Sequence, residues 1–335
     1  MNCPGFWHPE LPVFLQACME TPLMARLKQV GMNCGCEYTA FPRFRNLAPY
    51  SRYTHSVGVA LIVWHFTEDP VQAAAGLLHD AAAPAFSHTV DFLRGDALRQ
   101  EATEAGTAEI IRGSRALMAV LRQYGIPVEG VCDAHRWPIA DNDPPRLSAD
   151  RLEYSMGNAL RFGFRTRAEL AEDYLDLTVV PNEEGAPELA FRHRERAEGF
   201  AEAALACSRV YVSDEDRYAM QRLAELLRDA LAAGVISEED LAGTEPGVIA
   251  ALLRDPATAA AWQAFRRMEC LIRAREPGAE GPWRRVAAKK RAIDPLVAGE
   301  GRLRALSPAF ASHLDDFLAQ PQDDWLCEKH SSRRD

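Results

Sequence analysis

The chain has 335 residues, of which 47% are hydrophobic and 26% are charged, the balance of a globular protein rather than a disordered one. Its formal net charge of −10 argues against a broad electrostatic surface for nucleic acid, so a bound phosphate must meet a local cluster of positive groups. The sequence has no run of roughly 18 apolar residues, the length that a membrane span needs, and it begins without a secretory signal pattern. We therefore expect a cytoplasmic protein with neither a membrane nor a nucleic-acid partner.

Apolar residues recur at three- and four-residue spacing along much of the chain, which is the pattern of amphipathic helices. The windows that predict helices are, in chain order, Val57–Phe66, Val71–Leu78, Arg146–Leu160, Arg196–Val210 and Asp216–Ala233. Between the third and fourth windows, Asp176–Pro181 and Glu188–Phe191 predict two short strands joined as a small β-hairpin. The predicted fold class is therefore mainly α.

The best break in the chain is the Gly- and Pro-containing stretch 275–282. We expect a helical catalytic domain over residues 1–275 and an appended segment with additional C-terminal helices over residues 276–335. The basic run Arg284–Arg291 is interpreted as a solvated helix face, with a site for a nucleotide phosphate as the alternative. The eight cysteines are scattered, with Cys34 and Cys36 as a close pair, and we expect free thiols rather than a zinc site.

The strongest chemical signal is the pair His79-Asp80 at the end of an apolar helical run, where the backbone can bend so that imidazole and carboxylate converge. Upstream, His55 opens another predicted helix three residues after Arg52, so both side chains can face one cavity. Downstream, Asp150 begins a third helix. Two imidazoles and two carboxylates suit a divalent ion such as manganese, iron, magnesium or zinc. We therefore predict that His55, His79, Asp80 and Asp150 hold such a metal.

Three segments, RYTHSVGVA, AAGLLHDAAAPAFSH and ADRLEY, resemble the motifs of the HD superfamily of metal-dependent phosphohydrolases. Within that superfamily they are most similar to the deoxynucleoside triphosphate triphosphohydrolase-like branch. The resemblance covers roughly residues 20–160. It implies an HD-domain helical bundle in which the four predicted metal-binding residues match the family's ligands. It also implies a homo-oligomer.

The resemblance further implies which residues bind the substrate. Arg52 and Arg151 match family positions that meet substrate phosphates, a task that suits a guanidinium group. Gln29, Tyr154 and Asn158 match positions near the sugar.

Two departures from the family concern proton transfer. Where the triphosphohydrolases have histidines, this chain has Ala83 and Thr103. Glu104 and His88 are the best substitutes in the sequence, since a carboxylate or an imidazole near a metal can orient water or accept its proton. With Asp80, they form the predicted catalytic set.

We therefore expect an enzyme, a phosphoric or triphosphoric ester hydrolase that acts on a nucleotide or related small-molecule phosphate ester through metal-activated water. The alternative is a catalytically weak HD protein that binds metal and nucleotide as a sensor or scaffold. A two-metal phosphodiesterase is disfavoured, because the stretch between Asp80 and Asp150 contains no histidines other than His88 and His135. We assign no role to His135, and we expect His65 to be a packed helix residue.

Overall fold

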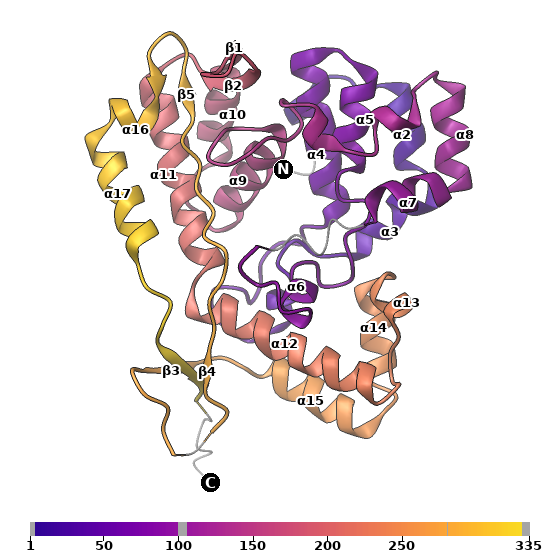
Figure 1. The fold of residues 1–335 in the computed structure, drawn as a ribbon, viewed down its shortest axis with the longest axis vertical. Coiled ribbons are helices and arrows are strands. Elements are labelled where there is room, and N and C mark those ends of the chain that lie inside the picture. Colours follow the sequence, from indigo (N-terminus) through magenta and orange to yellow (C-terminus); the bar gives the residue numbers. More distant parts are fainter. Residues whose placement is uncertain (1–3, 100–105, 280, 330–335) are drawn as a thin grey trace.

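The computed structural model describes residues 4–99, 106–279 and 281–329, which form helices and two small sheets (Figure 1). This arrangement confirms the predicted mainly α class. The α-helices are α1 (Pro4–Trp7), α2 (Val13–Met19), α3 (Pro22–Arg26), α4 (Arg52–Thr67), α5 (Pro70–Leu78), α6 (Thr89–Leu93), α7 (Thr107–Gly113), α8 (Arg115–Gln123), α9 (Ala149–Arg161), α10 (Arg167–Leu175), α11 (Arg194–Tyr211), α12 (Asp214–Ala232), α13 (Glu238–Leu241), α14 (Glu245–Leu252), α15 (Pro256–Arg266), α16 (Leu303–Leu306) and α17 (Pro308–Ala319). The short 3-10 helices are η1 (Leu27–Gln29), η2 (Cys36–Tyr38), η3 (Val128–Gly130) and η4 (Ala134–Arg136).

Side-chain caps set the starts of the three helices that matter most for the site. Ser51 accepts a hydrogen bond from the backbone of Thr54 at the start of α4, and Asp69 accepts two at the start of α5. Ser148 caps α9 by accepting from the backbone of Arg151, so this helix begins at Ala149 rather than at the predicted Arg146. The other predicted windows lie within α4, α5, α11 and α12, except that α12 ends at Ala232.

Helix α4 is buried over most of its length, because its residues are apolar on nearly all sides and it packs against both α5 and α9. Gly76 of α5 allows a close approach, since a Cβ at this position would lie 3.2 Å from Val63 Cγ2. A second apolar cluster surrounds α12 and α15, with Tyr218 and Trp262 among its buried side chains. Figure 1 shows α12 and α15 in the lower part of the molecule, below α4 and α5.

The strands are β1 (Leu177–Pro181), β2 (Pro187–Phe191), β3 (Leu271–Ala274), β4 (Arg284–Arg285), β5 (Leu296–Val297), β6 (Gly301–Arg302) and β7 (Trp325–Glu328). The predicted hairpin is present as antiparallel β1 and β2, and β5 and β6 extend it into a sheet of order β1-β2-β5-β6. The second sheet has the order β3-β7-β4. Each sheet therefore contains strands from both sides of residue 275. The domain boundary that we expect at this position stays a prediction.

The basic run Arg284–Arg291 is not helical, so its interpretation as a helix face is wrong. Its first two residues form β4 and pair with β7, and the backbone N–H of Ala288 donates to the side chain of Gln322. The chain then continues in extended form to β5, and Figure 1 shows this stretch running the length of the molecule beside α11. None of the described helices is both long enough and apolar enough to cross a membrane.

Candidate metal centre

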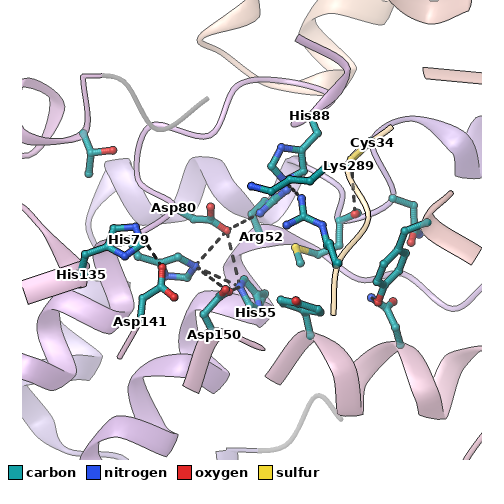
Figure 2. A pocket seen from close by; sticks show the side chains of 18 of the residues that line it. Cys34, Arg52, His55, His79, Asp80, His88, His135, Asp141, Asp150 and Lys289 are labelled. Carbon is teal, nitrogen blue, oxygen red and sulfur yellow. Dashed lines mark hydrogen bonds and ion pairs between the residues drawn. The ribbon is translucent and has the colours of Figure 1, made fainter. Parts of the chain in front are cut away.

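A cavity of about 270 Å³ is lined by side chains from α4, α9 and α12 and from the loop that follows α5. This volume is near the lower end of the range for small-molecule sites. The predicted metal-binding residues His55, His79, Asp80 and Asp150 all line it, and Figure 2 shows their side chains turned toward one another.

The donor atoms of His55, His79 and Asp80 lie within 4.8 Å of one another, and the Asp150 carboxylate lies beside both imidazoles. The Nε2 atoms of His55 and His79 are 3.2 Å apart, and Asp80 Oδ2 lies 3.9 Å and 3.5 Å from them, respectively. Asp150 Oδ1 lies 2.9 Å from His55 Nε2 and 3.6 Å from His79 Nε2. Ligands that bind one ion at about 2.1 Å and near right angles would be about 3 Å apart. The donor set and its spacing therefore fit a divalent cation.

The Nδ1 atoms of both imidazoles have hydrogen-bond partners in the protein. These contacts orient the Nε2 atoms toward each other. His55 Nδ1 lies 2.5 Å from the carboxylate of Glu153, and His79 Nδ1 lies 2.8 Å from the carbonyl oxygen of Gly76. Such outer partners fix the tautomer and the orientation of metal-binding histidines. Glu153 is buried and also accepts a hydrogen bond from the Tyr50 hydroxyl.

Two glycines make room for this supporting network. A Cβ at Gly58 would lie 2.5 Å from Glu153 Cγ, and one at Gly157 would lie 2.7 Å from the Tyr50 hydroxyl oxygen. Glu153 is not among the predicted site residues, although its spacing in the sequence is a usable signal. It follows Asp150 by three residues, so both carboxylates share one side of α9.

The carboxylates favour positive charge at the centre of this cluster. Burial lowers the pKa of His55, but hydrogen bonds to Asp150 and Glu153 outweigh this effect and raise it to about 10. Burial raises the pKa of Asp80, yet the Arg52 guanidinium and the two imidazoles hold it well below its usual range. An environment that stabilises an imidazolium in this way also stabilises a bound cation.

Arg52 is held beside the cluster by a strained turn. Its Nη1 donates to Asp80 Oδ2 at 2.9 Å, and its Nε donates to the Ser87 hydroxyl at 3.0 Å. Ser87 and Phe86 both have left-handed backbone conformations, with φ of +48° and +64°. Such conformations are costly for residues other than glycine, and they often occur where a side chain must be aimed at a site. Here the turn directs the Ser87 hydroxyl toward Arg52.

The loop that follows Asp80 is fixed from outside the cavity by Arg26. Its guanidinium donates to the carbonyl oxygens of Ala81 and Ala83, at 2.8 Å and 2.9 Å, and to that of Gly243. Ala83 is 4% exposed and is absent from the lining of the cavity. Ala83, which stands where the triphosphohydrolases that the sequence resembles have a histidine, is therefore a packing residue in this chain.

Three further basic side chains, of which His88 is uncharged at pH 7, line the cavity on the side of Arg52. His88, Lys289 and Arg291 line the cavity, and Figure 2 shows His88 and Lys289 close to Arg52. His88 Nδ1 bonds to Asp91 at 2.9 Å, and its Nε2 lies 3.3 Å from Arg291 Nη2. Burial lowers the pKa of His88 to about 4, with the positive charges of Arg291 and Arg52 acting in the same direction, so its imidazole is neutral at pH 7.

The other predicted substrate-binding residues have different surroundings. Tyr154 and Asn158 line the cavity, and Asn158 Nδ2 donates to the Tyr211 hydroxyl at 2.8 Å. Gln29 is exposed at the end of η1 and is not part of the lining, so the structure gives no support to a substrate contact through it. Glu104 lies outside the residues that the structure describes.

Arg151 is buried and engaged within the protein. Its Nη1 donates to Asp141 Oδ1 and to the Ser148 hydroxyl, both at 2.8 Å, and its Nη2 donates to the Asn142 carbonyl. It does not line the cavity. The structure therefore supports a structural role for Arg151, as a clamp on the loop before α9, rather than the predicted phosphate contact.

The lining also contains a second histidine and carboxylate, for which the sequence predicts no role. His135 and Asp141 both face the cavity, with His135 Nε2 lying 3.4 Å from Asp141 Oδ2. His135 belongs to the short helix η4, and neither residue has a sequence neighbour that marks it as part of a site. Their position follows from the fold of the loop between α8 and α9.

Comparisons with known proteins agree with a phosphohydrolase fold. No protein-family model matches the chain. The chain is 29% identical over 201 residues to the uncharacterized protein YdhJ of Bacillus subtilis, covering 59% of this chain and 60% of the relative. It is 25% identical over 259 residues to the metal-dependent phosphohydrolase cns2 of Cordyceps militaris, covering 75% of this chain and 72% of the relative.

Among solved structures, a phosphohydrolase from Bacteroides thetaiotaomicron is similar with a TM-score of 0.66 and 15% sequence identity. The alignment covers 96% of this chain and 97% of that one. The two chains therefore share their fold over nearly their whole lengths, including the parts on both sides of residue 275.

Proposed function

We propose that this protein is a metal-dependent phosphohydrolase of the HD type, in which His55, His79, Asp80 and Asp150 hold one divalent cation. The observation that carries the proposal is the convergence of two imidazole Nε2 atoms and the Asp80 carboxylate in a cavity, with the Asp150 carboxylate beside both imidazoles. The likeness to a protein named a metal-dependent phosphohydrolase supports the same reaction class.

A divalent ion in this position would polarise a phosphoryl oxygen and lower the pKa of a water molecule. The protein's own contribution begins with Arg52. Its Nε and Nη1 groups are used by Ser87 and Asp80, which fixes the plane of the guanidinium. Its Nη2 group has no hydrogen-bond partner among the described residues, so it can donate to a phosphate oxygen.

Lys289 and Arg291 extend the positive surface away from the metal-binding residues. Together with Arg52 they form the local cationic cluster that a protein of net charge −10 needs for binding a phosphate ester. Charges of this kind also stabilise the negative charge that develops on phosphoryl oxygens during hydrolysis. The neutral imidazole of His88 donates from Nδ1 to Asp91, so its Nε2 can accept a hydrogen bond from Arg291 and hold that guanidinium in the cavity.

We infer that the substrate is a nucleotide, as the resemblance to the deoxynucleoside triphosphate triphosphohydrolase-like branch implies. The cavity has the size of a small-molecule site, and Tyr154, Phe162 and Tyr211 offer aromatic surface beyond the cations. We propose Tyr154 and Asn158 as the residues nearest the sugar.

The test is a panel of nucleotides and simple phosphate esters, incubated with purified protein and manganese, magnesium or iron. We expect release of orthophosphate or of an inorganic polyphosphate, lost on addition of a chelator. Absence of turnover for every ester and metal, together with stoichiometric metal binding, would instead identify a sensor or scaffold that binds metal without hydrolysis.

A further inference from the structure

The loop between α8 and α9 brings to the cavity a histidine and a carboxylate that have no role in the chemistry proposed above. His135 lies in η4 and Asp141 lies in the stretch that follows, and both line the cavity. His135 Nε2 lies 3.4 Å from Asp141 Oδ2, and the His135 side chain is 53% exposed. A histidine beside a carboxylate transfers protons in many hydrolytic enzymes.

This pair is attached to the elements that carry the metal-binding residues. The backbone N–H of Asp150 donates to the carbonyl oxygen of Ala140 at 3.2 Å, so the backbone next to Asp141 lies against the first turn of α9. The short helix η4 packs against α5, whose C-terminal cap is His79. His135 and Asp141 are therefore held on the side of the cluster where His79 and Asp150 lie.

Arg151 fixes Asp141 from outside the cavity. Its Nη1 donates to Asp141 Oδ1 at 2.8 Å, and the same oxygen accepts from the backbone N–H of Asn142, also at 2.8 Å. These two contacts use Oδ1 and leave Oδ2 toward His135. A carboxylate held in this way orients the imidazole and stabilises its protonated form.

His88, the imidazole that the sequence predicts for proton transfer, has different surroundings. Its Nδ1 is bonded to Asp91 at 2.9 Å, and its Nε2 lies 3.3 Å from Arg291 Nη2. Both ring nitrogens are thus engaged by protein groups. His88 can hold the Arg291 guanidinium, but it is poorly placed to accept a proton from water.

The two histidines also lie on different sides of the cluster. In Figure 2, His88 lies beside Arg52. His135 lies past His79, on the opposite side of the metal-binding residues. In hydrolysis of a phosphate ester, the attacking water and the leaving oxygen are roughly in line on opposite sides of phosphorus. With the phosphoryl group at Arg52 and the organic part of the ester toward Tyr154, the water approaches from the side of His135.

We propose that His135 is the proton acceptor of the hydrolysis, with Asp141 and Arg151 as its positioning residues. This inference rests on the proposed function, because it assigns one step of that reaction. The oxygen of water forms a bond to phosphorus while the bond from phosphorus to the ester oxygen breaks, and one proton of the water passes to Nδ1 of His135. The ester oxygen takes a proton from the solvent, and the imidazolium returns its proton to the solvent. One water molecule is consumed for each ester.

The variant His135→Gln tests this step, since an amide side chain can form hydrogen bonds but does not act as a base. The assay uses manganese-loaded protein and the nucleotide or simple phosphate ester that the wild type hydrolyses fastest. We expect kcat to fall by roughly 100- to 1,000-fold, with KM changed by less than about threefold. An unchanged kcat would overturn the proposal.

Added imidazole distinguishes a proton acceptor from a structural residue. More than half of the His135 side chain is exposed, so imidazole from solution can enter the space that His135→Ala leaves. We expect imidazole to restore hydrolysis by His135→Ala in proportion to its concentration, and to leave Asp80→Ala inactive. If imidazole restores no activity to His135→Ala, His135 does not transfer the proton.

A titration with manganese separates this role from metal binding. We expect His135→Gln to bind manganese within about twofold of the wild-type affinity, since the metal-binding residues are intact. A loss of about tenfold or more would make His135 a metal ligand and overturn the proposal. The matched control is His193→Gln, because His193 is an exposed histidine that pairs with the carboxylate of Asp176 and does not line the cavity. It should leave kcat unchanged.

Asp141→Asn tests the positioning role. We expect kcat to fall by about tenfold, without rescue by imidazole, because His135 is still present but lacks its anionic partner. A wild-type kcat in Asp141→Asn would show that the carboxylate does not position His135. Melting temperatures of all variants show whether a lost rate reflects a lost fold.

Failure of this step can be told apart from failure of the proposed function. If the wild type hydrolyses no ester, the proposed function fails and the step at His135 fails with it. If the wild type hydrolyses an ester and His135→Gln does so equally fast, only the step at His135 fails.

Discussion

The two ends of the cavity are built in opposite ways. At the metal end, formed by His55, His79, Asp80 and Asp150, the groups come from helix termini and are hydrogen-bonded to one another or to buried partners. The apolar end is the part of the lining that includes Met32, Cys34, Phe44 and Met220. There Asp216 accepts a weak hydrogen bond from the thiol of Cys36, which lies about 180 residues earlier in the chain. The comparison indicates that the metal end is organised by contacts among helix-terminal residues, whereas the apolar end depends on a long-range contact between a loop and α12.

The largest effect should come from the metal end itself. Asp80→Ala removes a proposed ligand and the partner of Arg52, so we expect phosphate-ester hydrolysis to fall by roughly a thousandfold or more. Steady-state rates with added manganese measure this. The matched control is His65→Ala. His65 lies near the other end of α4 and is exposed, so its prediction as a packed helix residue is wrong, and its replacement should leave the rate unchanged. If the Asp80→Ala variant hydrolyses the ester as fast as the wild type, the metal end does not take part in catalysis.

A smaller effect should follow from loss of the support behind His55. Glu153→Gln leaves the ring without its anionic partner, so we expect the affinity for manganese to fall by about 10- to 100-fold. Calorimetric titration measures it, with Glu195→Gln at an exposed position of α11 as the control. If both variants bind manganese as tightly as the wild type, His55 does not depend on Glu153 for its orientation.

The third prediction concerns the cations between the two ends. Arg291→Ala removes a positive charge from the cavity, and we expect KM for a phosphate ester to rise by about tenfold with a smaller change in kcat. Arg285→Ala provides the control, since Arg285 is exposed on β4 and does not line the cavity. An unchanged KM for Arg291→Ala would show that the phosphate lies elsewhere.

The smallest effect concerns stability behind the apolar end. Burial and the nearby Glu245 raise the pKa of Glu37 to about 8, so the folded protein binds this proton more tightly than the unfolded chain does. The free energy of unfolding should therefore fall as pH rises from about 4.5 through about 8. Glu37→Gln removes this dependence, and we expect the loss of Tm between pH 6 and pH 8.5 to shrink by a few degrees.

Melting curves of wild type, Glu37→Gln and the surface control Glu10→Gln measure this pH dependence. The same slope in all three proteins would show that Glu37 is ionised in the folded state. A slope reduced in Glu37→Gln alone would link the titration to the loop that carries Cys34 and Cys36.

The difference between the two ends also explains what could be predicted from the sequence. His55, His79, Asp80 and Asp150 each lie in a short motif at a helix terminus, so their convergence could be expected; that they bind metal stays a prediction. Asp216 has no such local pattern, because its surroundings come from the loop at Cys34–Cys36.

The position of Lys289 and Arg291 in the cavity also depends on long-range contacts, so it could not be predicted from the sequence. Lys289 and Arg291 reach the cavity because the preceding residues pair with β7 and because the side chain of Gln322 holds the backbone of Ala288. Neither contact has a local signal in the sequence. The basic composition of Arg284–Arg291 therefore predicts a solvated helix. Pairing with β7 and Gln322 instead makes this stretch an extended segment that brings Lys289 and Arg291 to the cavity.

The most direct test of the account is a titration of chelator-treated protein with manganese, comparing wild type with His79→Ala. We predict one tightly bound ion per chain for the wild type and binding at least about 100-fold weaker for His79→Ala, because one of four ligands is lost. Absence of binding by the wild type, or equal binding by both proteins, would contradict a metal centre at His55, His79, Asp80 and Asp150.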